Sequence, residues 1–234
     1  MNTAESLRAG ASWVRAIASY VPWRLRYRRA SHGRVPAGDI SIFYRRYGAG
    51  DPVLLLHGGF MLCESWLAQV PGLADGYQVV AMDSRGHGRT TLGSRRLTYR
   101  QLGRDAAAFI EAMGIGPANL VGTSDGGTAA LHLAIERPDL VSSVALLGTP
   151  FNTANYTPGA WRAIHRFLRP RSPALLFTRC LRRVLSPERG TWGVFYEMMK
   201  EMWLTLPDLT VEDLGRIRAP VLVVGCDRDE FLSG

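Results

Sequence analysis

The chain has 234 residues, of which 47% are hydrophobic and 21% are charged. This composition is ordinary for one globular domain and excludes a disordered, collagen-like or disulfide-rich chain. The three cysteines, Cys63, Cys180 and Cys226, form no CxxC pair. They therefore indicate neither a zinc site nor a disulfide framework, and they favour a reducing, cytoplasmic location.

The formal net charge is +8, and arginine carries almost all of the positive charge because Lys200 is the only lysine. The excess lies in a basic N-terminal arm, residues 1–37, and in residues 162–189, where Glu188 is the only acid. Neither segment matches a nucleic-acid-binding motif, so we expect no nucleic-acid partner and interpret most of this charge as a solvated face. Weak contact of the arm with an anionic membrane surface is the alternative.

From residue 38 to residue 150 the pattern alternates between strands and helices, which predicts an α/β fold with a mostly parallel sheet flanked by helices. The expected strands are 40–44, 52–56, 77–82, 119–122 and 141–147, and the expected helices are 99–113 and 125–136. Continuous apolar runs such as 52–56 are typical of strands that are buried on both faces. The first strand alternates polar and apolar residues and predicts a partly antiparallel start.

The alternation stops at Phe151. Residues 151–207 are rich in aromatic residues and methionine in helical-looking stretches that prolines interrupt, which predicts a helical insertion. Strand character returns in residues 208–234, with an apolar run at 220–224. We therefore expect a core in two parts, 38–150 and 208–234, separated by a helical cap, 151–207.

Gly122-Thr123-Ser124-Asp125-Gly126 matches G-x-S-x-G between an expected strand and an expected helix. This is the setting of a nucleophile elbow, in which a sharp turn exposes a serine hydroxyl at the carboxyl edge of the sheet. The flanking glycines suit such a turn because side chains would clash there. Ser124 is the predicted nucleophile.

The loop after the strand at 52–56 reads His57-Gly58-Gly59-Phe60. Acyl transfer places negative charge on a carbonyl oxygen, and fixed backbone N–H groups stabilise that charge. We expect the N–H groups of Gly59 and Asp125 to form this oxyanion hole, with Phe60 as the alternative to Gly59. His57 is expected to brace the loop.

Two aspartates, Asp227 and Asp229, follow the late strand. The acid of a serine triad on this kind of sheet follows a late strand and comes after the nucleophile in the chain. Asp229 is preferred, and Asp227 is the alternative because it is better placed to brace the turn.

Together, His57-Gly58-Gly59, Asp83-Ser84-Arg85-Gly86-His87-Gly88, the Ser124 elbow and the Asp229 loop resemble the α/β-hydrolase superfamily in order and spacing. The Ser-Asp-Gly-Gly form of the elbow is similar to that of valacyclovir-hydrolase-like esterases. The resemblance runs from about residue 38 onward. It implies a mostly parallel eight-stranded sheet, a helical cap over the active site, and a triad histidine that comes after the acid.

The sequence departs from that pattern at its end. All the histidines, namely His32, His57, His87, His132 and His165, precede Asp229. We expect that the last strand, the last helix and the catalytic histidine of the pattern are lacking because a longer parent chain is truncated. Without a general base the hydroxyl of Ser124 is a poor nucleophile, so near-inactivity is expected.

The leading hypothesis is a serine hydrolase that cleaves an ester or related acyl bond of a small molecule. Hydrolysis of a C–C bond or lactone on the same fold, and a non-catalytic ligand-binding protein, remain as alternatives. No ligand spacing indicates a metal or an organic cofactor, so none is expected.

Overall fold

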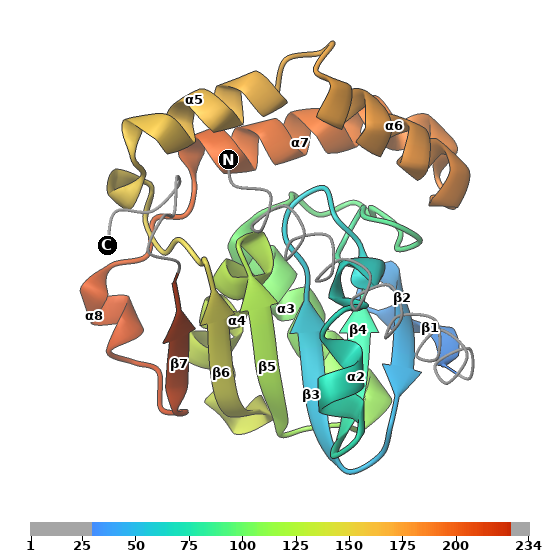
Figure 1. Ribbon diagram of the computed structural model, residues 1–234, viewed down its shortest axis with the longest axis vertical. Coiled ribbons are helices and arrows are strands. Elements are labelled where there is room, and N and C mark those ends of the chain that lie inside the picture. Colours follow the sequence, from blue (N-terminus) through green and yellow to red (C-terminus); the bar gives the residue numbers. More distant parts are fainter. Residues whose placement is uncertain (1–29, 226–234) are drawn as a thin grey trace, which may run out of the picture. The chain divides into compact units, whose positions relative to one another are not determined.

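The computed structural model describes residues 30–225, which contain one seven-stranded sheet in the order β1-β2-β4-β3-β5-β6-β7 (Figure 1). The strands are β1 (Ser31–Ala37), β2 (Ile40–Tyr47), β3 (Asp51–Leu56), β4 (Tyr77–Met82), β5 (Ala118–Thr123), β6 (Val141–Leu147) and β7 (Val221–Val224). The helices are α2 (Val70–Ala74), α3 (Tyr99–Met113), α4 (Asp125–Glu136), α5 (Pro158–Phe167), α6 (Pro173–Leu185), α7 (Trp192–Thr205) and α8 (Val211–Leu214).

The strand pairing confirms the predicted fold class. β2 pairs antiparallel with β4, whereas β3, β4, β5, β6 and β7 are joined by parallel pairings. The carboxyl ends of these five strands therefore meet at one edge of the sheet. In open parallel sheets this edge is where ligands bind.

The boundary of the N-terminal arm differs from our expectation. Residues 31–37, which we assigned to the arm, form the edge strand β1. The sequence Ser-His-Gly-Arg-Val-Pro-Ala lacks a regular apolar alternation, and only Ala37 is buried. An edge strand tolerates this proline because its N–H side needs no partner strand. Residues 1–29 lie outside the described part of the chain.

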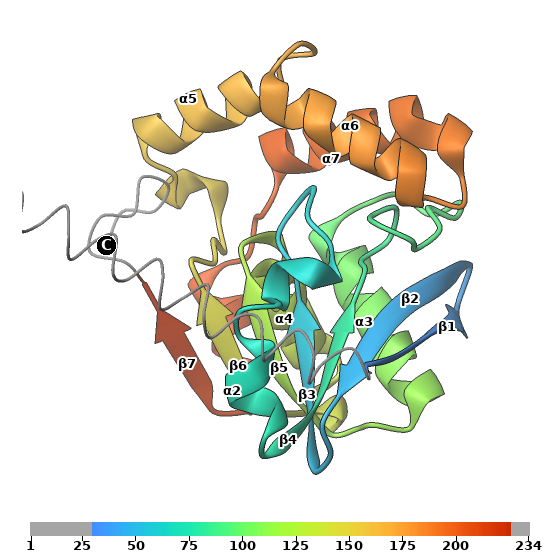
Figure 2. The ribbon, with the colours of Figure 1, turned by 45° about the vertical axis from the view of Figure 1, so that its right-hand side comes forward.

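Helices cover both faces of the sheet. α2 lies on one face, and α3 and α4 pack together on the other (Figures 1 and 2). Buried aliphatic residues of the strands, including Leu54, Val80 and Leu120, contact Phe109 and Ile110 of α3 in one hydrophobic cluster. This cluster fixes the sheet beneath the edge where the site lies.

The helix α3 has the boundaries expected from its sequence. The Thr98 side chain accepts a hydrogen bond from the Gln101 N–H, as an N-cap residue does. The helix ends at Gly114, which adopts a left-handed conformation with φ of 61°.

Three helices, α5, α6 and α7, lie above the carboxyl edge of the sheet, inside the segment named the cap (Figure 2). Thr157 and Ser172 cap α5 and α6 by accepting hydrogen bonds from backbone N–H groups. The inner sides of these helices share a second hydrophobic cluster with loops of the core. Its buried members are Phe60, Leu92, Leu97, Tyr99, Leu102, Ala129, Ile164, Leu168, Leu175, Phe195, Met199 and Met202.

The late strand β7 extends the sheet but carries exposed apolar side chains. Val223 is 73% exposed and Leu222 is 61% exposed. A strand of this kind is a site at which other chains can pair.

The guanidinium of Arg85 joins the loop after β4 to two other parts of the core. Its side chain is fully buried. It donates two hydrogen bonds to Asp105 of α3, at 2.6 and 2.7 Å, and two to Asp39, at 2.7 and 3.1 Å. A further bond at 2.9 Å reaches the Leu92 carbonyl. The hydrogen bonds from Arg85 also hold the pKa of Asp39 well below its usual value.

Replacing Arg85 with methionine leaves the carboxylates of Asp39 and Asp105 without their shared partner. We expect Arg85→Met to lower the free energy of unfolding by about 3–5 kcal/mol, because a buried charge loses its counter-ion. Urea denaturation measures this change. The matched control is Arg96→Met, which removes an exposed arginine that pairs with Glu201 and should cost less than about 1 kcal/mol. Equal losses of unfolding free energy in the two variants would contradict the role of Arg85 as the buried partner of both carboxylates.

Candidate active site

Ser124 occupies the turn between β5 and α4, with φ of 50° and ψ of −122°. A positive φ is rare for a residue with a side chain, and such strain is concentrated at functional sites. The Ser124 N–H donates to the Leu147 carbonyl of β6 at 3.1 Å, which ties the turn to the neighbouring strand. The backbone therefore has the strained conformation that the G-x-S-x-G pattern predicts.

The glycines around Ser124 allow the backbones to approach closely. A Cβ on Gly122 would lie 2.6 Å from the backbone of Gly127. A Cβ on Gly126 would collide with the Leu56 carbonyl, and one on Gly127 would collide with the Thr149 side chain. Contacts this short do not occur in real structures, so these positions require glycine. They draw the start of α4 against the ends of β3 and β6.

The loop after β3 lies beside the elbow. A Cβ on Gly58 would lie 3.5 Å from the Ser124 Cβ. The Phe60 N–H donates to His87 Nε2 at 3.0 Å, so this N–H is already engaged. Within residues 30–225, the Gly59 N–H has no such partner. Of the two donors that the sequence left open, Gly59 is the one whose N–H is available.

Two histidines brace this loop. His57 Nε2 accepts the Ser84 N–H at 3.0 Å, so its Nδ1–H donates to the Gly58 carbonyl at 2.8 Å. His87 has the same tautomer, since its Nδ1 lies 2.9 Å from the Arg85 carbonyl. Burial lowers the pKa of both rings, which favours the neutral form. Both nitrogens of each ring are used, so neither histidine is free to act as a base for Ser124.

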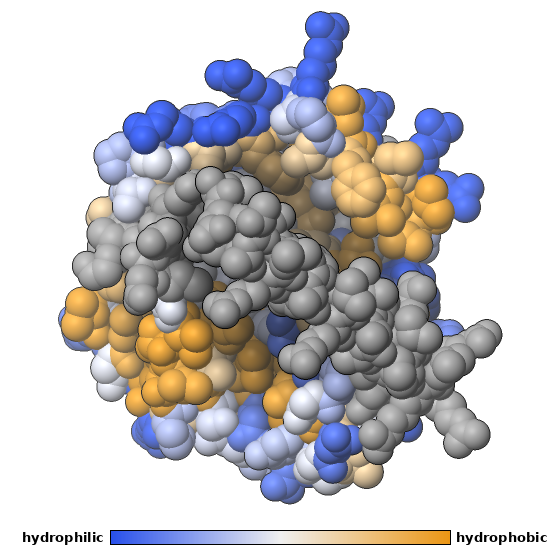
Figure 3. Space-filling view, viewed as in Figure 1, coloured by the Kyte–Doolittle hydropathy of each residue, from blue (hydrophilic) through white to orange (hydrophobic). Residues whose placement is uncertain are grey.

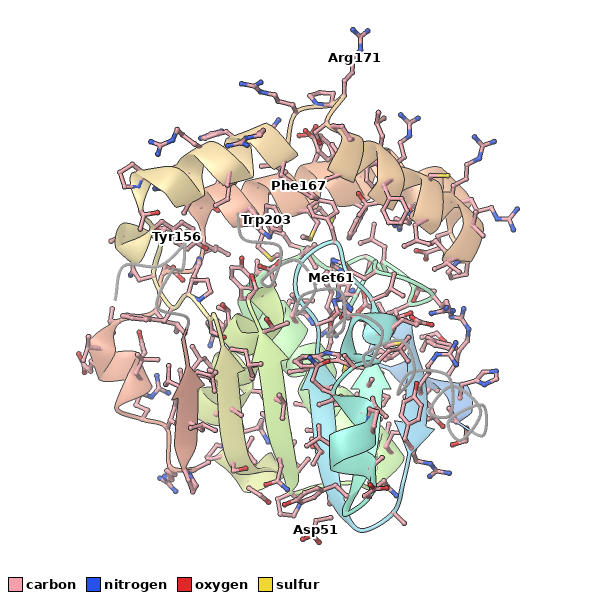
Figure 4. All side chains as sticks on the ribbon, in the orientation of Figure 1. Asp51, Met61, Tyr156, Phe167, Arg171 and Trp203 are labelled. Carbon is pink, nitrogen blue, oxygen red and sulfur yellow. The ribbon has the colours of Figure 1, made fainter. Side chains whose placement is uncertain are left out.

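A cavity of about 710 Å³ lies between Ser124 and the cap. Its walls are mostly apolar side chains from the loop after β6 and from the helices α5, α6 and α7. Arg166 is the one basic residue among the described residues that line it. The lining residues are Ser124, Asp125, Gly148, Pro150, Tyr156, Ala163, Ile164, Arg166, Phe167, Ser172, Pro173, Ala174 and Trp203. Figure 4 shows Tyr156, Phe167 and Trp203 between the cap helices and the sheet. No histidine is among these lining residues of the described chain.

The carboxylate of Asp125 connects the elbow to the cap. It accepts hydrogen bonds from Trp203 Nε1 of α7 at 2.7 Å and from the Tyr99 hydroxyl at 3.1 Å. Burial raises the pKa of Asp125 to about 6, against the hydrogen bonds from Trp203, Tyr99 and its own backbone N–H, which lower it. The role predicted for Asp125 from the sequence, in the oxyanion hole, involves only its backbone N–H. The one feature of the sequence that could have indicated a role for the Asp125 side chain is its position directly after Ser124.

The three remaining histidines, for which no catalytic role was predicted, lie elsewhere. His32 is on β1, His132 is on α4, and His165 is on α5 with its ring tilted against Trp161. β7 ends at Val224, whose carbonyl accepts the Gly148 N–H at 3.1 Å, at the edge of the sheet that holds Ser124. The two candidate acids, Asp227 and Asp229, lie outside the described residues.

Cys63, Glu64 and Asp83 form a cluster with ligand atoms within 4.8 Å of one another. The carboxylates of Glu64 and Asp83 are already paired with Arg89, and Glu64 is also paired with Arg45. Burial raises the pKa of the Cys63 thiol, which opposes formation of the thiolate that a metal needs. The cluster is therefore better described as an internal ion-pair network.

The raised pKa of Asp125 makes stability depend on pH. The pKa is near 4 in the unfolded chain and about 6 in the folded protein, so ionisation disfavours folding. We expect wild-type stability to fall by about 2 kcal/mol relative to Asp125→Asn as the pH rises from 4 to 7. Urea denaturation at several pH values measures the difference.

Asp139→Asn is the control, because the stability contributed by Asp139 should change with pH in the opposite direction. Hydrogen bonds from Arg137 lower the pKa of Asp139, so any stability it adds appears as the pH rises. A constant difference between wild type and Asp125→Asn over this pH range would contradict the assignment for Asp125.

Comparison with known proteins supports the fold described above. The profile described as alpha/beta hydrolase fold matches residues 51–186. A 2-hydroxy-6-oxo-6-(2'-aminophenyl)hexa-2,4-dienoic acid hydrolase of Metapseudomonas resinovorans is 35% identical over 58% of this chain and 46% of its own length. A pyrrolizixenacetamide deacetylase of Xenorhabdus hominickii is 27% identical over 85% of this chain and 81% of its own.

A crystal structure of a serine hydrolase involved in carbazole degradation is 25% identical, with a TM-score of 0.66. It covers 84% of this chain and 79% of its own. The matches span less than half the length of the first curated relatives. The profile match, the sheet order and the elbow agree with one another, and the chain belongs to the α/β-hydrolase fold family.

Proposed function

We propose that the protein is a hydrolase that cleaves an ester or related acyl bond of a small molecule, with Ser124 as the nucleophile. The observation that carries this proposal is the strained backbone of Ser124 at the floor of an apolar cavity. A serine that lay in an ordinary turn would need no positive φ. The names of the relatives, a deacetylase and a dienoic acid hydrolase, are consistent with hydrolysis of a small molecule.

The oxyanion hole consists of the N–H groups of Gly59 and Asp125. Gly59 belongs to the loop packed against Ser124, and Asp125 begins α4, where the helix N-terminus favours negative charge. The Asp125 N–H faces its own carboxylate in the free protein. It becomes the second donor when a carbonyl enters the cavity.

The cavity favours a substrate with an apolar group. Phe167 and Trp203 line the cavity, whereas Phe195 and Met199 of the cap are buried in the second hydrophobic cluster and are packing residues. Arg166 adds a positive charge to the cavity wall. A substrate that carries both an apolar group and a carboxylate suits this lining best.

Asp229 is the proposed acid, with Asp227 as the alternative, because both follow β7 in the sequence and β7 ends at the edge of the sheet where Ser124 lies. The general base is the missing part. All five histidines lie within residues 30–225, and none lines the cavity. We therefore expect these 234 residues to hydrolyse esters only slowly.

The lack of a histidine among the described residues that line the cavity favours a second candidate function. This candidate is a non-catalytic ligand-binding protein that uses the cavity as a receptor site. Ser124 would then contact the ligand without attacking it. The elbow and the available Gly59 N–H favour the hydrolase. Chemistry at Ser124 distinguishes the two candidates.

Labelling with a fluorophosphonate probe tests whether Ser124 is a nucleophile. We expect slow labelling that Ser124→Ala abolishes and that added imidazole accelerates, because imidazole supplies the absent base within an open cavity. The rate of label incorporation is the measurement.

Ser143→Ala is the control, since this serine donates to Asn119 on the sheet and lies outside the cavity lining. It should label like wild type. If folded wild-type protein incorporates no label even with imidazole, Ser124 is not a nucleophile and the ligand-binding candidate takes precedence.

A further inference from the structure

Apart from Arg166, which lines the cavity, the cap carries a concentration of positive charge that the proposed chemistry does not use. Residues 158–191 contain eight arginines and one acid, Glu188. The Glu188 carboxylate accepts the Leu92 N–H of the core, so it is occupied on the inner side. The segment therefore has a formal charge of +7 with no acid on its outer surface to balance it.

Seven of these arginines are exposed, and none forms an ion pair within the described part of the chain. They are Arg162, Arg166, Arg169, Arg171, Arg179, Arg183 and Arg189. Figure 4 shows Arg171 directed away from the sheet at the turn between α5 and α6. Exposed arginines elsewhere in the fold, such as Arg100 and Arg104, pair with Glu136. On the cap, Lys200 pairs with Glu197 of α7, but the seven exposed arginines have no such partner within residues 30–225.

Apolar side chains are exposed among these arginines. On α6, Phe177 is 69% exposed, Val184 is 67% exposed and Leu176 is 46% exposed. Phe177, the exposed Cys180 and Val184 follow a spacing of three and four residues, and Leu176 lies four residues before Cys180, so all four share one face of the helix. Figure 3 shows hydrophobic surface bordered by hydrophilic side chains at the cap.

A hollow of about 650 Å³ lies beside this face. It is lined by Arg179, Arg182, Arg183, Arg189, Gly190, Trp192 and Gly193. The guanidinium of Arg182 is already engaged, since it donates to the Gly86 carbonyl at 2.9 Å and to the Thr191 hydroxyl at 2.9 Å. The other three arginines of the hollow are exposed, and an indole ring stands beside them.

We propose that this cap surface, formed by α6 and the arginines beside it, docks onto an anionic lipid bilayer. A helix that alternates exposed apolar residues and arginines inserts its apolar side chains at the interface, while its arginines contact lipid phosphates. None of the helices within residues 30–225 is long and apolar enough to cross a bilayer.

The docked surface borders the cavity above Ser124. Arg166 and Phe167 of α5, and Ser172, Pro173 and Ala174 at the start of α6, line that cavity. Docking would bring this side of the cavity close to the lipid layer, from which an apolar substrate can enter. Membrane binding itself does not depend on hydrolysis, so the two proposals can fail separately.

Sedimentation of the full chain with vesicles tests the proposal. We expect binding to vesicles that contain phosphatidylglycerol, little binding to pure phosphatidylcholine, and weaker binding at high salt. Each arginine near the surface contributes about fivefold in affinity. Arg179→Gln combined with Arg183→Gln should therefore weaken binding roughly 25-fold.

Two further variants separate the charged and apolar contributions. Arg100→Gln combined with Arg104→Gln removes the same charge from α3 and should change binding less than twofold. Leu176→Ser combined with Phe177→Ser should remove the binding that persists at high salt. Thermal unfolding of each variant verifies that it is folded.

Several outcomes would overturn the proposal. Equal loss of binding in the α3 and α6 arginine variants would show that net charge alone acts. Binding that no cap variant weakens would place the contact elsewhere in the chain. Tighter binding to a short DNA duplex, weakened by the α6 variants, would identify nucleic acid as the partner. A dimer that Leu176→Ser with Phe177→Ser dissociates would identify a second copy.

Discussion

The strained backbone at Ser124 is the constraint on which the site depends. A positive φ at a residue with a side chain costs about 1–3 kcal/mol, so it persists only where neighbouring contacts enforce it. Gly126 packs against the Leu56 carbonyl of β3, and Gly127 packs against Thr149 after β6. Placing β5 between β3 and β6 therefore holds the turn in position. The strand order at the centre of the sheet is thus what directs Ser124 toward the cavity.

The cap is joined to this constrained edge by few polar contacts. Trp203 donates to Asp125, Arg182 donates to the Gly86 carbonyl, and Glu188 accepts the Leu92 N–H. One of these contacts involves the residue directly after the nucleophile. The protonation state of Asp125 therefore acts at two places, since it affects both the attachment of α7 and the charge beside Ser124. Cap position and site electrostatics are coupled through one carboxylate.

Local sequence patterns were sufficient for most of the fold. β3, β4 and β6 are short segments rich in apolar residues, and Thr98 and Gly114 mark the ends of α3, so these elements were predicted closely. β1 was missed because an edge strand with one buried residue has no strong pattern. The elbow was predicted because its pattern lies within five consecutive residues.

Contacts between distant residues were not predictable in this way. Arg85 meets Asp39 and Asp105 across separations of 46 and 20 residues, and Trp203 meets Asp125 across 78. Only the packed sheet and cap bring such groups together.

The arginines of α6 show why a charge count alone cannot identify a partner. Arg182 and Arg183 are adjacent in sequence, yet Arg182 is buried with its guanidinium bonded to the core, over the ring of Phe195. Arg183, the next residue along the helix, is exposed. A helix turns by about 100° per residue, so one of two adjacent arginines can be bonded to the core while the other faces solvent. The net charge of +8 counts buried arginines and exposed arginines alike. Only the outward set can attract a partner, and in the cap that set is concentrated beside exposed apolar side chains.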